Sequence, residues 1–140
     1  MFVYCRKAQY HETDQMGIIH HANYIKWMEE ARVEFMEEMG LGYKDVEQHG
    51  VLSPVAGLTV DYKKPVHFAD EVEVRVSVQK YTGVILEMRY EFFNRTRNEL
   101  CTTAVSRHCF MKDNKVVSLK RALPQLDANI RAGMEADSGE

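Results

Sequence analysis

Residues 23–39, NYIKWMEEARVEFMEEM, decide the fold, because they predict one long helix that another element must cover. Apolar side chains recur at spacings of three and four and therefore share one helical face: Tyr24, Met28, Ala31 and Phe35. Gly40 is placed to end the helix, and Asn23 to cap its first amides. The helix would be about 25 Å long. So broad an apolar face needs a sheet or a second helix against it.

The sequence after this helix predicts strands. In residues 71–80, valines alternate with mainly polar residues, and this period of two is typical of a half-buried strand. Residues 84–93 and 100–111 follow after turns at 82–83 and 94–99. Residues 56–63 form an earlier strand that Pro65 ends, and residues 2–9 a first one. Consecutive strands with short turns predict an antiparallel sheet, and one helix against it makes an α+β domain.

Size, charge and cysteines narrow the class of protein. The 140 residues fit one domain, which we place at residues 1–126, followed by a polar, frayed tail over residues 127–140. A net charge of −3 excludes the broad positive field of a non-specific nucleic-acid binder. No run approaches the roughly 18 apolar residues of a membrane span, and the first residues do not resemble a signal peptide. Three cysteines, an odd number, favour reduced thiols and a cytoplasmic protein: Cys5, Cys101 and Cys109.

The loop before the helix, residues 10–24 (YHETDQMGIIHHANY), holds most of the reactive side chains. Asp14 precedes a helix start, whose free amides favour negative charge and could stabilise an oxyanion on a carbonyl substrate. A carboxylate there could attack that carbonyl or activate a water. The alternative is structural, since Asp and Gly in TDQMG are common turn formers. A metal site is a third interpretation, although its ligands match no familiar spacing: His11, Asp14, His20 and His21.

Other polar residues have simpler structural interpretations. Glu29 or Glu30 could act as a general base from the helix, but a solvated face is the simpler reading. Arg32 falls on the apolar side, so we expect its stem to snorkel or its charge to pair with a carboxylate. The cysteines lie in strands, where packing is their usual role. Three lysines form a weak basic set that could meet phosphates: Lys63, Lys64 and Lys80.

Several spaced motifs together resemble one family. Residues 10–24 carry Tyr10, Asp14, Gly17, His21 and Asn23-Tyr24 at fixed spacing, and residues 27–32 follow with WMEEAR. Residues 50–55 (GVLSPV), the YKKP of residues 62–65 with Asp70, and residues 119–124 continue the match. The pattern resembles the hotdog-fold acyl-CoA thioesterases of the 4-hydroxybenzoyl-CoA thioesterase family, in its YbgC/FadM-like branch.

The resemblance implies a sheet wrapped around one long helix, and homodimers or homotetramers with active sites at the dimer interface. It implies that Asp14 is the nucleophile or general base, and that the amide of His21 polarises the thioester carbonyl. Some members of this branch also have His at that position, which gives its side chain a supporting role. Tyr10 would line the site. The residues that it places in contact with substrate are Gly17, which permits the loop bend, and Lys64, Lys80 and Thr82. Lys80 is the one basic residue close to the strand that contacts phosphate in the family.

The activity that the resemblance implies is hydrolysis of an acyl-CoA to a carboxylic acid and free coenzyme A, without metal or cofactor. Two alternatives stay open. The substrate could be carried on acyl carrier protein, or the chain could be a non-catalytic module that binds an acyl ligand.

Overall fold

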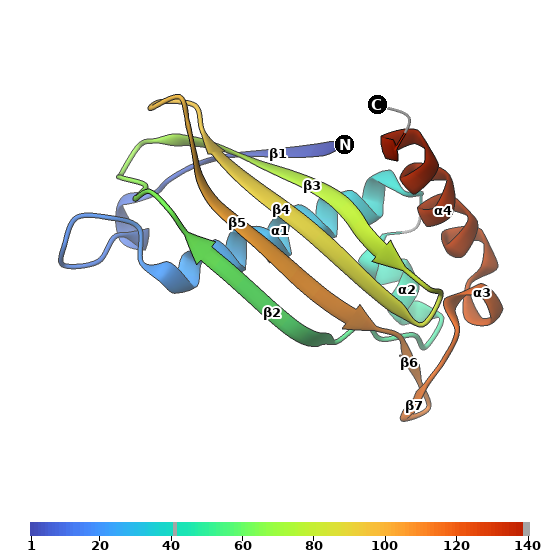
Figure 1. Ribbon diagram of the computed structural model, residues 1–140. Helices are drawn as coiled ribbons and strands as arrows, with labels where there is room; N and C mark the ends of the chain where they lie inside the picture. The colour runs from blue at the N-terminus through green and yellow to red at the C-terminus, as the bar shows by residue number, and fades with distance from the viewer. Residues whose placement is uncertain (41, 139–140) are drawn as a thin grey trace.

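The computed structural model describes residues 1–40 and 42–138. One antiparallel sheet has the strand order β1-β3-β4-β5-β2 (Figure 1). Its strands are β1 (Phe2–Lys7), β2 (Val55–Tyr62), β3 (Glu71–Tyr81), β4 (Ile85–Asn94) and β5 (Glu99–Cys109), and a small hairpin joins β6 (Met111–Lys112) to β7 (Lys115–Val116). The helices are the 3-10 helix η1 (Tyr10–Glu12), α1 (His21–Glu38), α2 (Tyr43–Gln48), α3 (Leu119–Ala122) and α4 (Pro124–Ser138).

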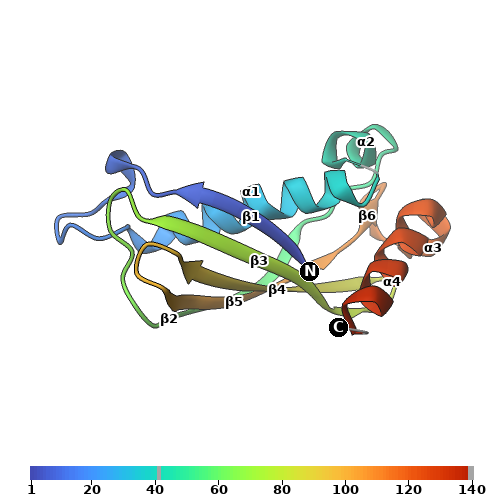
Figure 2. The same cartoon turned by 90° about the horizontal axis from the view of Figure 1, so that it is seen from above.

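The sheet curves around α1, which lies along one of its faces (Figure 2). Trp27 and Ala31 of the helix are fully buried, as are Met88 and Phe92 of the facing strand β4. Side chains along β4 alternate strictly between buried and half-buried, as a strand with one face on a core requires. The predicted α+β domain, an antiparallel sheet around one long helix, is confirmed.

The start of α1 differs from the prediction. The helix begins at His21, two residues earlier than expected, and His20 precedes it. Asn23 therefore lies inside the first turn, and its side-chain amide donates to the carbonyl of Glu12 at 2.8 Å instead of capping the helix. The N-cap prediction for Asn23 is wrong, because the loop supplies an acceptor that a local pattern does not reveal. Gly40 follows the helix with a φ of +90°, the conformation that favours glycine at a helix end.

The segment predicted as a frayed tail is helical. Residues 124–138 form α4, whose Leu126 and Ile130 are fully buried. Tyr81 donates a hydrogen bond to Asp127, and the Arg131 guanidinium lies 5.0 Å from the centre of the Tyr81 ring. The two apolar residues Leu126 and Ile130, four positions apart, are enough to pack this helix against the end of β3. The prediction of a frayed tail is therefore wrong. Residues 139–140 lie outside the described residues, and the domain boundary at residue 126 stays a prediction.

Candidate active site

Asp14 opens a tight turn between η1 and α1. Its amide donates to the carbonyl of Ile18 at 2.8 Å, and the amide of Gly17 donates to the carbonyl of Asp14 at 3.1 Å. Gly17 has a φ of +79°, which glycine adopts without strain. The amide of Met16 donates to Asp14 Oδ1 at 2.8 Å. The turn thus holds one carboxylate oxygen, while Oδ2 has no hydrogen-bond partner within residues 1–40 and 42–138.

This turn closes a short hairpin that packs on the loop between β2 and β3. The hairpin pairs Thr13 with Ile19, and the amide of Ile19 donates to the carbonyl of Val66 at 2.8 Å. Ile18 forms a further antiparallel bridge with His67. Backbone contacts from two sides therefore fix the position of Asp14.

Asp70 stabilises the β2–β3 loop on which that hairpin rests. Its carboxylate accepts hydrogen bonds from the amide of His67 at 2.9 Å, from Asn94 Nδ2 at 2.9 Å and from Arg97 Nε at 3.1 Å. Burial opposes its charge, yet these bonds and the Arg97 charge hold the pKa of Asp70 below its usual value. The role of this motif residue in the structure is to hold the loop.

The first turn of α1 faces the same cleft as Asp14. The amides of His21 and Ala22 belong to that turn, where the helix itself offers no acceptor and the dipole is positive. A cleft of about 370 Å³ is lined by the Asp14 turn, the start of α1 and the end of β2: Asp14, Met16, Ile18, Ile19, His21, Tyr24, Tyr62, Lys63, Lys64 and Pro65. Asp14, the first residue of α1 and a cationic side chain therefore line one space.

Tyr62 links β2 to the helix start inside this cleft. Its hydroxyl donates to the carbonyl of His21 at 2.8 Å, and its ring packs edge-on against Tyr24 with centroids 5.0 Å apart. Burial raises the pKa of Tyr62, so its hydroxyl keeps the proton that this bond uses. Sequence reasoning did not assign Tyr62 to the site, although the YKKP motif contains it.

The predicted site residues are only partly brought together. Gly17 forms the Asp14 turn, and Lys64 lines the cleft. Tyr10 lies in η1, is 75% exposed and packs edge-on against Phe68 with ring centroids 5.6 Å apart. It is not one of the residues that line the cleft within this chain, so its role at the site stays a prediction.

Lys80 and Thr82 lie at the hairpin between β3 and β4, at the opposite end of the sheet from the Asp14 turn (Figure 1). Thr82 Oγ1 accepts from the amides of Val84 at 3.3 Å and Ile85 at 3.0 Å, and so stabilises the turn. One chain does not bring these two residues to Asp14. Their contact with substrate stays a prediction for a site that two copies share.

The other candidates have structural partners. Glu30 accepts from Tyr4 and from Arg6, so it does not lie on a merely solvated face. Arg32 is 5% exposed and lies 3.6 Å from Glu29, the carboxylate pairing that was one of its two expected roles. Among residues 1–40 and 42–138, no three His, Cys, Asp or Glu side chains are grouped to hold a metal ion.

The chain resembles known thioesterases in sequence. The family model of the thioesterase-like superfamily matches residues 8–130. The chain belongs to this superfamily. It is 38% identical over 120 residues to a putative acyl-CoA thioesterase, YneP, of Bacillus subtilis, across 84% of this chain and 86% of that protein. It is 32% identical over 120 residues to a putative esterase of Aquifex aeolicus, across 86% and 92% of the two chains.

A solved thioesterase structure superposes closely on this chain. The DHNA-CoA thioesterase of Staphylococcus aureus superposes with a TM-score of 0.92 at 33% identity, covering 99% of this chain and 94% of that one. The hotdog fold that the sequence motifs implied is confirmed by this likeness. No helix of the described residues is long and apolar enough to cross a membrane.

Proposed function

We propose that this chain hydrolyses the thioester of an acyl-coenzyme A, giving a carboxylic acid and free coenzyme A. The observation that carries the proposal is the cleft that Asp14 shares with His21, the first residue of α1. Membership of the thioesterase-like superfamily supports the same reaction. The alternatives of a carrier-protein substrate and of a non-catalytic binding module are left for experiment.

The chemistry needs only the Asp14 carboxylate, a water and the first amides of α1. The free oxygen of Asp14 attacks the thioester carbonyl, or takes a proton from a water that attacks it, and the carbonyl oxygen becomes an oxyanion. The amides of His21 and Ala22 donate to that oxyanion, where the helix dipole favours negative charge. The carbon–sulfur bond then breaks, and the thiolate of coenzyme A leaves and takes a proton. If Asp14 attacks directly, water hydrolyses the resulting anhydride and restores the carboxylate.

We further propose that two copies join along β2 and complete the site. β2 is an edge strand of the sheet and its side chains are largely exposed. Val55, Leu58 and Tyr62 of this strand are 41–51% exposed, and Ile25 of α1 is 39% exposed. A strand edge with exposed apolar side chains favours pairing with another chain. A dimer of this kind, or a tetramer built from two of them, would act in the cytoplasm.

The test is substitution of Asp14→Asn in an assay of thiol release from acyl-CoA substrates. Asparagine keeps an oxygen for the Met16 amide, so the turn persists while the attacking or basic group is lost. We expect turnover to fall by about 10²- to 10⁴-fold. Asp113→Asn is the matched control, because it removes the same charge from an exposed turn between β6 and β7.

The substrate panel includes aliphatic chains and an aromatic acyl group, since one structural relative is named a DHNA-CoA thioesterase. Equal turnover of the two variants on every active substrate would refute the role of Asp14. Faster release from matched acyl carrier protein than from coenzyme A would favour the first alternative. Tight binding of acyl-CoA without release of thiol would favour the second.

A further inference from the structure

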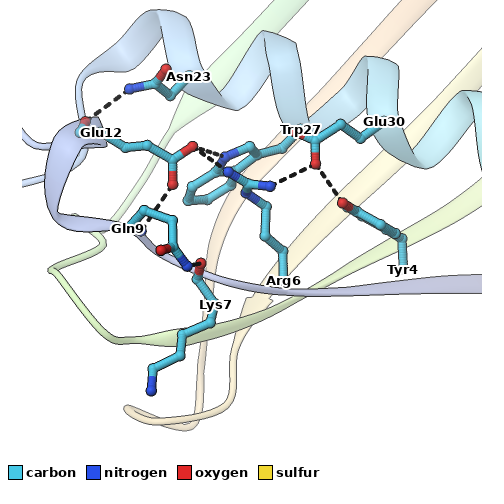
Figure 3. Close-up of polar contacts among 8 residues, drawn as sticks. All are labelled: Tyr4, Arg6, Lys7, Gln9, Glu12, Asn23, Trp27 and Glu30. Atoms are coloured by element: carbon cyan, nitrogen blue, oxygen red, sulfur yellow. Dashed lines mark hydrogen bonds and ion pairs between the residues drawn. The ribbon is translucent and has the colours of Figure 1, made fainter.

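A buried carboxylate lies directly behind the Asp14 turn. Glu12 is 5% exposed, and each of its side-chain oxygens has a donor (Figure 3). Oε1 accepts from the amide of Gln9 at 2.9 Å. Oε2 accepts from Trp27 Nε1 at 2.8 Å and from the guanidinium of Arg6 at 2.5 Å. The carboxylate therefore connects β1, η1 and the second turn of α1.

The backbone of Glu12 closes the hairpin that carries Asp14. Its carbonyl accepts from the amide of His20 at 2.9 Å and from Asn23 Nδ2 at 2.8 Å. Glu12 and His20, which flank the hairpin, are thus joined by a hydrogen bond. Glu12 also binds two successive turns of α1, through Asn23 and Trp27. Asp14 lies two residues further along the same chain.

Arg6 divides its charge between two carboxylates. Its second nitrogen donates to Glu30 Oε2 at 2.7 Å, and its guanidinium centre lies 5.3 Å from the centre of the Trp27 ring. Figure 3 shows Glu12 and Glu30 on opposite sides of this guanidinium. Glu30 is bonded only to Arg6 and Tyr4 among the described residues, and neither belongs to the Asp14 hairpin. The two carboxylates share a partner but differ in their connection to the site.

Glu12 remains charged in this position. Burial raises its pKa, but the hydrogen bonds from Trp27, the Gln9 amide and Arg6, together with the Arg6 charge, bring the pKa below its ordinary value. A charged acceptor makes stronger hydrogen bonds than a neutral one. At neutral pH the hairpin and α1 are therefore connected by hydrogen bonds to a charged acceptor.

We propose that Glu12 is a positioning residue, which fixes the Asp14 carboxylate relative to the first amides of α1. The inference rests on the proposed function, since it assigns Glu12 a role only through Asp14 and those amides. Attack on the thioester needs the carboxylate or its water on one side of the carbonyl carbon while the amides hold the oxygen. Because Glu12 connects the two elements that supply these groups, its loss lets their separation vary, and a misplacement of about 1 Å can cost about 10²-fold in rate.

The experiment compares Glu12→Gln with Glu30→Gln. Both replace a carboxylate bound to Arg6 by a neutral amide of the same size, so both weaken the same cluster. We expect Glu12→Gln to lower kcat by about 10- to 100-fold with little change in KM, because the cleft residues Tyr62 and Lys64 make no contact with it. Glu30→Gln should keep kcat within about threefold of the wild type, as expected for an interaction outside the catalytic geometry.

A double variant separates positioning from general loosening. In the Asp14→Asn background, Glu12→Gln should cause no further loss of kcat, since residues that act as a unit are strongly non-additive. If the two losses multiply, Glu12 acts independently of Asp14 and the proposal is wrong. Equal kcat values for Glu12→Gln and Glu30→Gln would also overturn it.

Should Glu12→Gln not fold, Asn23→Ala tests the same connection. It removes the donor to the Glu12 carbonyl and leaves the ion pair between Arg6 and Glu12 intact, and alanine is favoured in a helix. A lower kcat at unchanged KM supports positioning, whereas an unchanged kcat contradicts it. An inactive Asp14→Asn with a fully active Glu12→Gln would refute the positioning role alone. A fully active Asp14→Asn would refute the proposed function itself.

Discussion

His108 should make the stability of the protein fall in mild acid. It lies on β5, is 1% exposed, and its Nε2 is 2.7 Å from Ser106 Oγ, which in turn is 2.8 Å from the hydroxyl of Tyr90. Its Nδ1 lies 3.5 Å from a guanidinium nitrogen of Arg32. Burial, and then the Arg32 charge, lower the pKa of His108 from 6.5 to about 4. A hydrogen bond with the carbonyl of Pro54 raises this pKa and offsets part of the shift.

The sign and size follow from proton linkage. Between pH 6.5 and about 4 the unfolded chain binds a proton at His108 that the folded chain does not. The free energy of unfolding therefore falls as the pH falls, by about 1.4 kcal/mol per pH unit in this window. The stability associated with neutral His108 is complete above pH 6.5, and about 3 kcal/mol of it is lost by pH 4.

The assay is urea unfolding from pH 7.5 to 4.5 at fixed protein concentration, followed by the fluorescence of Trp27, the one tryptophan. The comparison is His108→Gln, which cannot take up this proton. Glu12, Asp70 and Asp127 have lowered pKa values and also lose stability in acid, but both proteins contain them, so they cancel in the difference. We expect the difference in unfolding free energy to shrink by about 2 kcal/mol between pH 6.5 and 5. Parallel pH curves would refute the reasoning.

Two further predictions test the C-terminal helix and the free edge of the sheet. Ile130→Ala should lower the free energy of unfolding by about 2–5 kcal/mol, because it leaves a cavity beneath α4, whereas Gln125→Ala on its exposed face should change it little; equal thermal stabilities would contradict the burial of α4. Leu58→Lys should convert dimers to folded monomers in sedimentation velocity, because a charge on an edge strand disfavours pairing. Val116→Lys on β7 is the control there, and an unchanged sedimentation coefficient for Leu58→Lys would contradict pairing along β2.

The candidate site shows which features a local sequence pattern can predict and which it cannot. Asp14 and Gly17 lie within four residues, so their spacing was enough to predict a turn ahead of a helix, and the structure has that turn. Thr82 also lies in a predicted turn, but its hydroxyl is used by the hairpin and lies at the far end of the sheet from Asp14. Proximity to a turn is visible in a sequence, whereas proximity between two turns depends on strand length and order.

Glu12, like Tyr62, was given no role at the site from the sequence. A glutamate in a polar loop has the same local pattern whether it faces water or is buried among donors. Its burial depends on Arg6 and Trp27, which reach it from β1 and α1. The N-cap prediction for Asn23 failed for a related reason, since its acceptor is the Glu12 carbonyl, eleven residues earlier.

The sequence by itself determined the strands, the long helix, the α+β class and the reactive loop, because the repeats of two and of three to four residues reflect which side of each element faces a core. Only the tertiary structure decided that residues 124–138 pack as a helix, that Lys80 and Thr82 lie far from Asp14 within one chain, and that a buried carboxylate supports the Asp14 turn. These features depend on contacts between segments that are distant along the chain. Such contacts are selected by the packing of the whole domain and leave no period in the sequence.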